Sequence, residues 1–300
     1  MRRAKRTTAA EIAEKLELSR TTVSLVLSGR AKKHRIAQST ADRVLGAVKE
    51  LHYRPNAAAQ QLALSTFFSY PIGARAIYSD IGLILLGMSV ERLTGLALDQ
   101  AVHRRVSTPL GLSRTHYRPI FNARTEIRDP KHLHCAQAQV SEINFAPTEI
   151  CAWRKRRVVG EVHDENAAGL GGVAGHAGIF STAADTAALG QMYLNHGGSL
   201  LRATTVAEMT RLQAEDGTTR RGLGFALWCA DPQASGNPFG EHAFGHTGFT
   251  GTSLWIDPER DLVAACLTNR VYYGRNAGGI LAFRVALHRA IVEAVDSIHG

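Results

Sequence analysis

The sequence predicts two parts of different fold class. Residues 1–64 form an all-α head, and residues 65–300 form an α+β body in which helices pack on an antiparallel sheet. Three observations support this division. Apolar residues recur at helical spacing through the head. Glycine-rich loops and strand-like apolar runs follow one another toward the C-terminus. The net charge of +9 is unevenly divided, with 13 Lys/Arg against 5 Asp/Glu in the head and 22 against 21 in the body.

The charge and cysteine patterns limit the classes of function. A basic head on a nearly neutral body is typical of a protein that binds a polyanion, although charge alone would favour an ordinary solvated basic face. The four cysteines are far apart and form no C-x-x-C pair, which favours a reducing compartment over a zinc ribbon or disulfide framework. The polar run "TTAAEIAEKL" near the N-terminus predicts no signal peptide, so we expect a cytoplasmic protein.

Residues 81–90, "IGLILLGMSV", are the longest apolar run. They are about half of the roughly 20 residues that a membrane-spanning helix needs. We therefore expect a buried helix at this position and no membrane partner.

The head contains three predicted helices. Thr8 and Glu11 form a capping box at the start of the first. Ser19 is placed to cap a second helix over Arg20–Leu27, and a third begins at about Gln38. Their apolar stripes are Ile12, Ala13 and Leu16, then Val23, Val26 and Leu27, then Val44, Val48 and Leu51.

The tight turn between the first two helices is helix-turn-helix geometry, in which the start of the second helix enters the major groove of DNA. Arg20 and Thr21 would then face base edges, where an arginine can bind guanine through two hydrogen bonds. The backbone amides at this helix start, with the hydroxyls of Ser19 and Thr22, suit phosphates.

The head resembles the DNA-binding head of the lactose-repressor (LacI-type) family. The matching runs are "TTAAEIAEKLELSRTTVSLVLSGR" and "TADRVLGAVKELHYRPNAAAQQLA". The resemblance implies that the partner is double-stranded DNA, bound by a pair of chains on a palindromic site. It implies that Leu62, in a short helix capped by Asn56, is a wedge that opens a minor-groove step. The predicted DNA-binding residues are Thr8, Ser19, Arg20, Thr21, Thr22, Ser24, Leu25, Asn56, Gln60 and Leu62.

The body is predicted to hold a helix over about Ile81–Thr94 and another that Ser181 or Thr182 caps. A final helix covers about Gly279–Ile298, and glycines cluster between positions 169 and 178. The strand-like runs are residues 223–230, 242–258 and 261–270, with a hairpin turn at "DPERD" between the last two.

The body resembles the serine beta-lactamase and penicillin-binding-protein-like family, including its class C and esterase branches, over most of residues 69–298. The triplet Tyr78-Ser79-Asp80 matches the family's Y-x-N motif, with Asp for Asn. The triplet His246-Thr247-Gly248 matches its K-T-G motif, with His for Lys. "GGVAGHAGIFST" and "LTNR" match framework segments of the family.

The resemblance implies a role for each motif residue. Tyr78 would assist proton transfer, His246 and Thr247 would line the side of the site that binds a substrate carboxylate, and the backbone after Gly248 would form half of an oxyanion hole. The chemistry also needs an activated serine followed by lysine three positions later. No serine in the chain has one, so Tyr78, Asp80, His246, Thr247 and Gly248 are predicted to be vestigial and the body to be a truncated, inactive domain.

The sequence therefore favours a sequence-specific DNA-binding transcriptional regulator that carries an inactive beta-lactamase-like body, with no cofactor and no metal. Two alternatives stay open. The first is a serine hydrolase of the beta-lactamase, esterase or peptidase class with an incidental head. The second is a non-functional fusion, because the two resemblances meet abruptly near Ser65.

Overall fold

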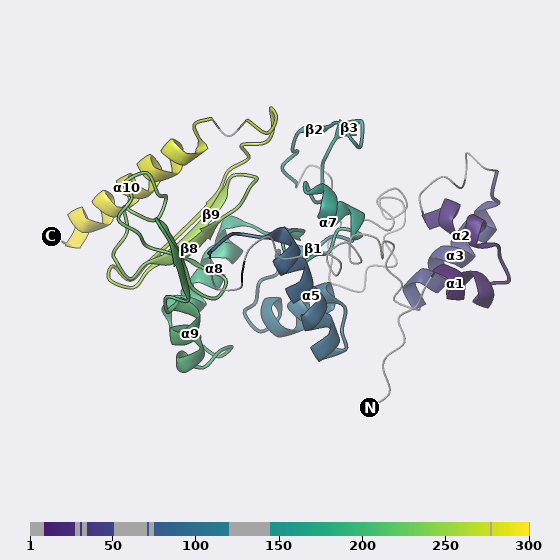
Figure 1. Ribbon diagram of the computed structural model, residues 1–300, viewed down its shortest axis with the longest axis horizontal. Coiled ribbons are helices and arrows are strands. Elements are labelled where there is room, and N and C mark those ends of the chain that lie inside the picture. Colours follow the sequence, from purple (N-terminus) through teal and green to yellow (C-terminus); the bar gives the residue numbers. More distant parts are fainter. Residues whose placement is uncertain are drawn as a thin grey trace.

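The computed structural model describes residues 9–27, 31, 35–50, 71, 75–119, 145–276 and 278–299 (Figure 1). Several predicted DNA contacts lie outside this part of the chain. They are Thr8, Asn56, Gln60 and Leu62, together with the side chains of Arg20 and Ser24.

The described head is a bundle of three helices, as predicted. They are α1 (Ala9–Lys15), α2 (Arg20–Leu27) and α3 (Gln38–Glu50). Its core is made of short aliphatic side chains that all three helices contribute. The fully buried ones are Ile12, Val23 and Val44.

Hydrogen bonds close the ends of the head helices. Ser19 caps α2, because its hydroxyl accepts from the amide of Thr22 at 2.9 Å. Arg43 of α3 donates to the carbonyl of Leu16 at 3.0 Å and so satisfies a carbonyl just after the end of α1. Lys15, at the end of α1, forms an ion pair with Glu50, at the end of α3, at 2.6 Å. This contact is exposed and contributes little to stability.

Within the described residues, the body contains helices α5 to α10, a π-helical turn η1 and ten strands. The helices are α5 (Asp80–Thr94), α6 (Leu98–Val102), η1 (His103–Ser107), α7 (Glu165–Gly169), α8 (Ala183–Leu194), α9 (Ala203–Thr210) and α10 (Ile280–His299). The strands are β1 (His116–Tyr117), β2 (Ile150–Cys151), β3 (Arg156–Arg157), β4 (Ile179–Phe180), β5 (Ala214–Asp216), β6 (Thr219–Arg221), β7 (Ala226–Leu227), β8 (Phe244–Thr247), β9 (Thr252–Asp257) and β10 (Leu262–Leu267).

Six of the strands form one antiparallel sheet in the order β10-β9-β8-β7-β6-β5. The predicted hairpin at "DPERD" joins β9 to β10. All three strand predictions were too long, and the run 261–270 keeps Leu262–Leu267 as β10. The run 242–258 divides into β8 and β9 at a turn that contains Gly251, whose φ of 114° ends the strand geometry. The run 223–230 keeps only β7, because Gly224, at φ 84°, leaves the extended region just before it.

The sheet is covered on both faces. On one face Leu254, Ile256 and Val263 pack toward α8, and a Cβ on Gly190 of that helix would lie 2.5 Å from Val263. On the other face Trp255 and Ala264 pack against α10 through Val292. The alternation along β9 and β10 therefore builds a helix–sheet–helix sandwich, and this confirms the predicted α+β class.

Helix α10 also buries two polar side chains that form hydrogen bonds within the sandwich. His288 is fully buried, with Nε2 3.3 Å from the Ser253 hydroxyl and Nδ1 2.7 Å from the Ser235 carbonyl. Arg284 is 5% exposed and donates to the carbonyls of Gly248 at 2.7 Å and Thr252 at 2.8 Å. These bonds hold the turn between β8 and β9 in place.

Helix α5 passes close to the glycine-rich segment. A Cβ on Gly175 would overlap the carbonyl of Leu83 and lie 3.1 Å from the amide nitrogen of Gly87. We expect Gly175→Ala to lower the free energy of unfolding by about 1–3 kcal/mol, the usual range for overpacking. Gly82→Ala in the same helix is the matched control, since its Cβ would meet only Ser79 atoms at 3.8 Å or more. That change should be neutral or stabilising by about 0.5–1 kcal/mol. The measurement is urea denaturation. Equal losses of stability in the two variants would contradict the close approach of Gly175 to α5.

Within the described ranges, no individual helix has the length and apolar character to cross a bilayer. Helix α5 together with Leu98–Ser107 would reach the required length and composition only as a pair bent by 73°.

Candidate functional site

The structure brings the two predicted motifs of the body together. Tyr78 lies just before α5, and His246 lies on β8. Their ring centroids are 6.0 Å apart with an interplanar angle of 43°. Residues 168 positions apart in the sequence therefore form one site, whose Tyr78 ring is half exposed (51%).

The protonation of this pair is set by burial and by nearby charge. Burial raises the pKa of Tyr78 above its usual value, and the Asp80 carboxylate raises it further. Burial lowers the pKa of His246 below its usual value, and the guanidinium groups of Arg221 and Arg284 add to this effect. At neutral pH, Tyr78 is therefore a neutral phenol and His246 a neutral imidazole.

Positive charge at this site comes from an arginine that the sequence motifs did not indicate. Arg221 ends β6 and places Nη1 3.4 Å from Nε2 of His246. His246 Nδ1 is 2.9 Å from the carbonyl of Thr247, which fixes the imidazole from its other side. A substrate carboxylate at this position would therefore meet a guanidinium rather than a protonated His246.

Thr247 and Gly248 lie where the motif predicts them, at the end of β8. The amide of Gly248 already donates to the carbonyl of Thr252 at 2.8 Å. Its own N–H is consequently used within the turn, and an oxyanion hole at this site would depend on the backbone that follows Gly248.

Ser79 serves as a helix cap. It has extended geometry, φ −141° and ψ 115°, and its hydroxyl accepts from the amide of Gly82 at 3.3 Å. The structure thus gives Ser79 a local structural role at the start of α5, where Asp80 in the first turn also complements the helix dipole.

Replacement of this cap should reduce stability. We expect Ser79→Ala to lower the free energy of unfolding by about 0.5–2 kcal/mol, because one amide of the first turn loses its acceptor. Ser79→Asn keeps a capping acceptor and should retain most of the stability. The measurement is chemical denaturation of the full chain followed by far-UV circular dichroism. Identical behaviour of the two variants would show that the cap does not contribute.

A second titratable cluster lies beside this site. Donor atoms of Asp80, Asp164 and His176 lie within 4.8 Å of one another. His176 Nε2 is 2.8 Å from Asp164 Oδ1, and the same oxygen caps α7 by accepting from Ala167 at 2.7 Å. Burial alone would raise the pKa of Asp164, but these hydrogen bonds outweigh it and leave the pKa below its usual value.

Two oxygens and an imidazole nitrogen are a donor set that a divalent transition metal can use. The surroundings fit such an ion poorly. His176 Nδ1 is buried and has no hydrogen-bond partner, whereas a metal-bound histidine normally donates its other N–H to a neighbour. The arrangement is explained by the cap of α7 and one His–Asp hydrogen bond, and we assign no metal to it.

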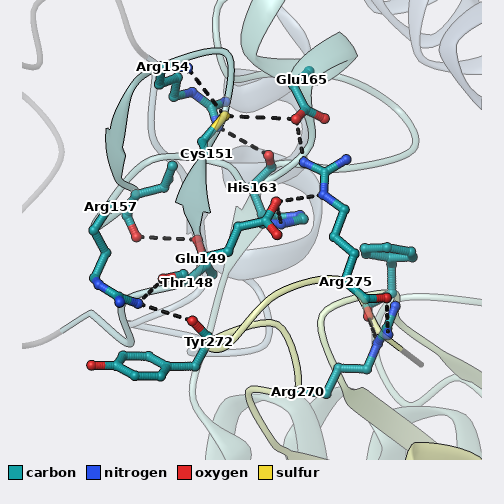
Figure 2. A network of polar contacts seen from close by, with 12 residues as sticks. Thr148, Glu149, Cys151, Arg154, Arg157, His163, Glu165, Arg270, Tyr272 and Arg275 are labelled. Atoms are coloured by element: carbon teal, nitrogen blue, oxygen red, sulfur yellow. Dashed lines mark hydrogen bonds and ion pairs between the residues drawn. The ribbon is translucent and has the colours of Figure 1, made fainter. Parts of the chain in front are cut away.

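An ion-pair network connects the β2–β3 hairpin with the segment after β10 (Figure 2). Glu149 accepts from Arg275 at 2.5 Å and lies 3.1 Å from Nε2 of His163. Arg275 also pairs with Glu165 at the start of α7. The hydrogen bond from Arg275 lowers the pKa of Glu165. The network therefore holds three separate segments against one another.

The same network supports the turn after His246-Thr247-Gly248. The ring of His163 stacks on Phe249 with centroids 5.8 Å apart, and the Arg270 guanidinium lies 4.2 Å from the centre of the Phe249 ring. Phe249 itself is 57% exposed. A large aromatic ring is thus presented to solvent directly beside the candidate site, and a histidine and an arginine fix its orientation.

Sequence reasoning missed several residues of this region. One available signal was the run His163-Asp164-Glu165, three consecutive titratable residues before a glycine-rich segment. Arg221 and Arg275 carried no local signal, and His176 lay in "GGVAGHAGIFST", which was matched only as a framework segment. They are brought to the site only by strand pairing and loop packing.

Comparison with known proteins agrees with the two-part organisation. Residues 56–287 match the family described as Beta-lactamase, and residues 8–56 match the family described as bacterial regulatory proteins, lacI family. An N-acetylmuramyl-L-alanine amidase from Bacillus subtilis (strain 168) is 38% identical over 211 residues, which cover 67% of this chain and 46% of the relative. A putative D-alanyl-D-alanine carboxypeptidase from Salmonella schwarzengrund (strain CVM19633) is 37% identical over 221 residues, 70% of this chain and 49% of the relative.

The chain spans about half the length of these curated relatives. Among solved structures, simvastatin synthase from Aspergillus terreus has a TM-score of 0.53 at 16% identity, with 87% of this chain and 63% of that one covered. EstCE1, a hydrolase with promiscuous acyltransferase activity, has a TM-score of 0.52 at 19% identity, with 79% and 63% covered. At this identity the two structures show a shared fold. The chain belongs to the beta-lactamase family, and it carries at its N-terminus the DNA-binding domain of the lacI family of bacterial regulatory proteins.

Proposed function

We propose that this protein is a sequence-specific DNA-binding transcriptional regulator whose beta-lactamase-like body does not hydrolyse substrate. The observation that carries the proposal is the pairing of a lacI-family helix-turn-helix with a body that has no Ser-x-x-Lys. A chain that reads genomic DNA acts where the DNA is, so the proposal places it in the cytoplasm.

The geometry of the head supports DNA binding. Val23 and Val26 of α2 are buried in the three-helix core, whereas Thr21 is exposed. The core thus fixes α2 by one face and leaves its first turn accessible to a groove. Ser19 and Thr22 lie at the same end, with their hydroxyl oxygens 2.8 Å apart. The start of α2 therefore presents hydroxyls and backbone amides of the kind that bind phosphate.

The body supports a binding role better than a catalytic one. Neutral Tyr78 and His246 and the guanidinium of Arg221 can hold a ligand that carries a carboxylate and polar groups. The two curated relatives are named as an amidase and a carboxypeptidase, and we propose that the body retains affinity for ligands of that chemical class. Attack on such a ligand would need an activated nucleophile, and Ser79, the serine closest in sequence to the motif tyrosine, is a helix cap.

One observation favours the alternative of a serine hydrolase with an incidental head. Tyr78 and His246, at the positions of the family's motif tyrosine and lysine, are still side by side, and Asp80 interacts with the tyrosine. A non-functional fusion would be expected to lose both DNA binding and ligand binding. The two alternatives are therefore separated from the proposal by a DNA-binding measurement combined with a test for covalent acylation.

The DNA-binding function is tested by replacement of Leu62, the predicted wedge. A preferred operator is first selected from random duplexes with the full chain. We expect Leu62→Ala to weaken operator binding about tenfold or more and random DNA binding little, because a wedge acts only where a base step is opened, at a few kcal/mol per step. Leu64→Ala, two positions later, is the matched control and should leave the ratio of the two affinities unchanged. Equal losses of affinity for the operator and for random DNA would indicate that Leu62 only packs within the head.

A further inference from the structure

Strand β10 forms one end of the six-stranded sheet. It pairs with β9 over all six of its residues, from Leu262 opposite Asp257 to Leu267 opposite Thr252. Among the described residues, no strand pairs with its other edge. Within the described part of the chain, the outward N–H and C=O groups of β10 are left for an added strand.

The residues of β10 itself lack the features that usually prevent strand addition. Natural edges are blunted by proline, by charged residues, or by a bulge. Residues 262–267 read "LVAACL", with no proline and no charge, and the pairing with β9 runs without interruption. Leu267, at the end of the strand, is 38% exposed. An unprotected apolar edge of this kind predicts a partner strand.

We propose that β10 pairs with β10 of a second copy of this chain, so that two bodies share one continuous antiparallel sheet. The choice of a second copy rests on the proposed function, because helix-turn-helix heads bind operators as symmetric pairs and the head needs a dimerising contact. Pairing of β10 with β10, in which both bodies use the same edge, supplies this dimerising contact.

Symmetry limits the possible registers. Residues directly opposite each other in an antiparallel pair face the same side of the sheet, and such residues are an even number of positions apart in the strand. A two-fold axis normal to the sheet therefore passes through one residue position, and that residue lies opposite its own copy. Ala264 and Ala265 are the central candidates, and each would lie opposite its own copy. Both are small, so two copies meet at the axis without steric conflict. The flanking pairs within the strand are then apolar, and like charges do not meet.

The two registers place Cys266 opposite different residues. With the axis at Ala264, Cys266 faces Leu262 of the second copy. With the axis at Ala265, it faces Ala264. Opposite residues of an antiparallel pair have Cα atoms about 4.5–5.5 Å apart, within the range of a disulfide. Leu262, Ala264 and Cys266 all alternate to the α10 face, whereas Val263 points toward α8.

The test uses the full chain with Cys135→Ser, which leaves the buried Cys151 and Cys229 and the half-buried Cys266. Leu262→Cys or Ala264→Cys is added and the protein is mildly oxidised without DNA. With the axis at Ala264, we expect Leu262→Cys to link to Cys266 and Ala264→Cys to link to its own copy. With the axis at Ala265, only Ala264→Cys should form a disulfide-linked dimer, through Cys266. Non-reducing peptide mapping identifies the linked residues and so distinguishes the two registers. Val263→Cys is the matched control and should not cross-link, because it faces the other side of the sheet.

A second measurement does not depend on the cysteine variants. The unmodified chain should sediment at twice 32.5 kDa at high concentration and dissociate on dilution. Hydrogen exchange of residues 262–267 should accelerate as the dimer dissociates. A monomer at all concentrations, a dimer without protection of β10, or undefined aggregates would each overturn the proposal. Because DNA is absent, these outcomes leave the DNA-binding proposal to be judged by its own assay.

Discussion

We expect the full chain to form no covalent adduct when it is incubated with a fluorescent penicillin or an activated ester. Acylation needs a serine whose proton is taken by a neighbouring lysine, and no serine in the sequence has a lysine three positions later. Loss of the nucleophile from a set of residues that act together costs about 10⁶ in kcat, nearly as much as loss of the whole set. The retained Tyr78 and His246 therefore cannot restore a measurable rate by themselves. Intact-mass spectrometry after prolonged incubation is the measurement.

The control is the same chain after heat denaturation, which reports non-specific labelling of exposed groups, with an active serine hydrolase to confirm the probe. An adduct above the denatured level would contradict the inactive body. If it mapped to Ser79, the Ser79→Ala and Ser79→Asn variants would both abolish it, although only the first loses the helix cap. The hydrolase alternative would then take precedence over the regulator.

The elements that the sequence predicted well are those whose signals are local. Thr182 caps α8 by accepting from Asp185, as its position before an apolar run predicts. The "DPERD" turn produces the β9–β10 hairpin because the strands on both sides are apolar and adjacent. Predicted ends of α5 and α10 agree with the observed ends to within one residue. At α5 the start is set by the Ser79 cap, a local signal.

Strand lengths in the body were predicted less well, because a strand is defined by its partners. The run 223–230 is apolar enough to be a strand, but only Ala226 and Leu227 pair in strand register with β6 or β8. Residues of the candidate site that depend on strand pairing were likewise not predicted. Tyr78 and His246 could be predicted from their motifs, whereas Arg221 reaches His246 only through the pairing of β6, β7 and β8.

The affinity of the full chain for duplex DNA should fall steeply with salt. The head carries 13 Lys/Arg against 5 Asp/Glu, and cations that neutralise phosphates release the counterions condensed on DNA. With about 6–10 phosphate contacts, affinity is expected to fall about 10³–10⁵-fold between about 50 and 200 mM salt. The measurement is a fluorescence-anisotropy titration of a labelled duplex at several salt concentrations, with the slope taken from the logarithmic plot.

A pair of lysine substitutions locates this effect. Lys33→Ala, in the basic run between the second and third helices, should reduce the magnitude of the logarithmic salt slope by about 1 if that side chain binds phosphate. Lys155→Ala, in the turn between β2 and β3 of the body, removes the same charge and should leave the slope unchanged. Equal effects of the two changes would mean that overall charge, and not the head, attracts the DNA. A flat response of the unmodified chain would remove the regulator proposal, because a helix-turn-helix cannot dock on a duplex without neutralising its phosphates.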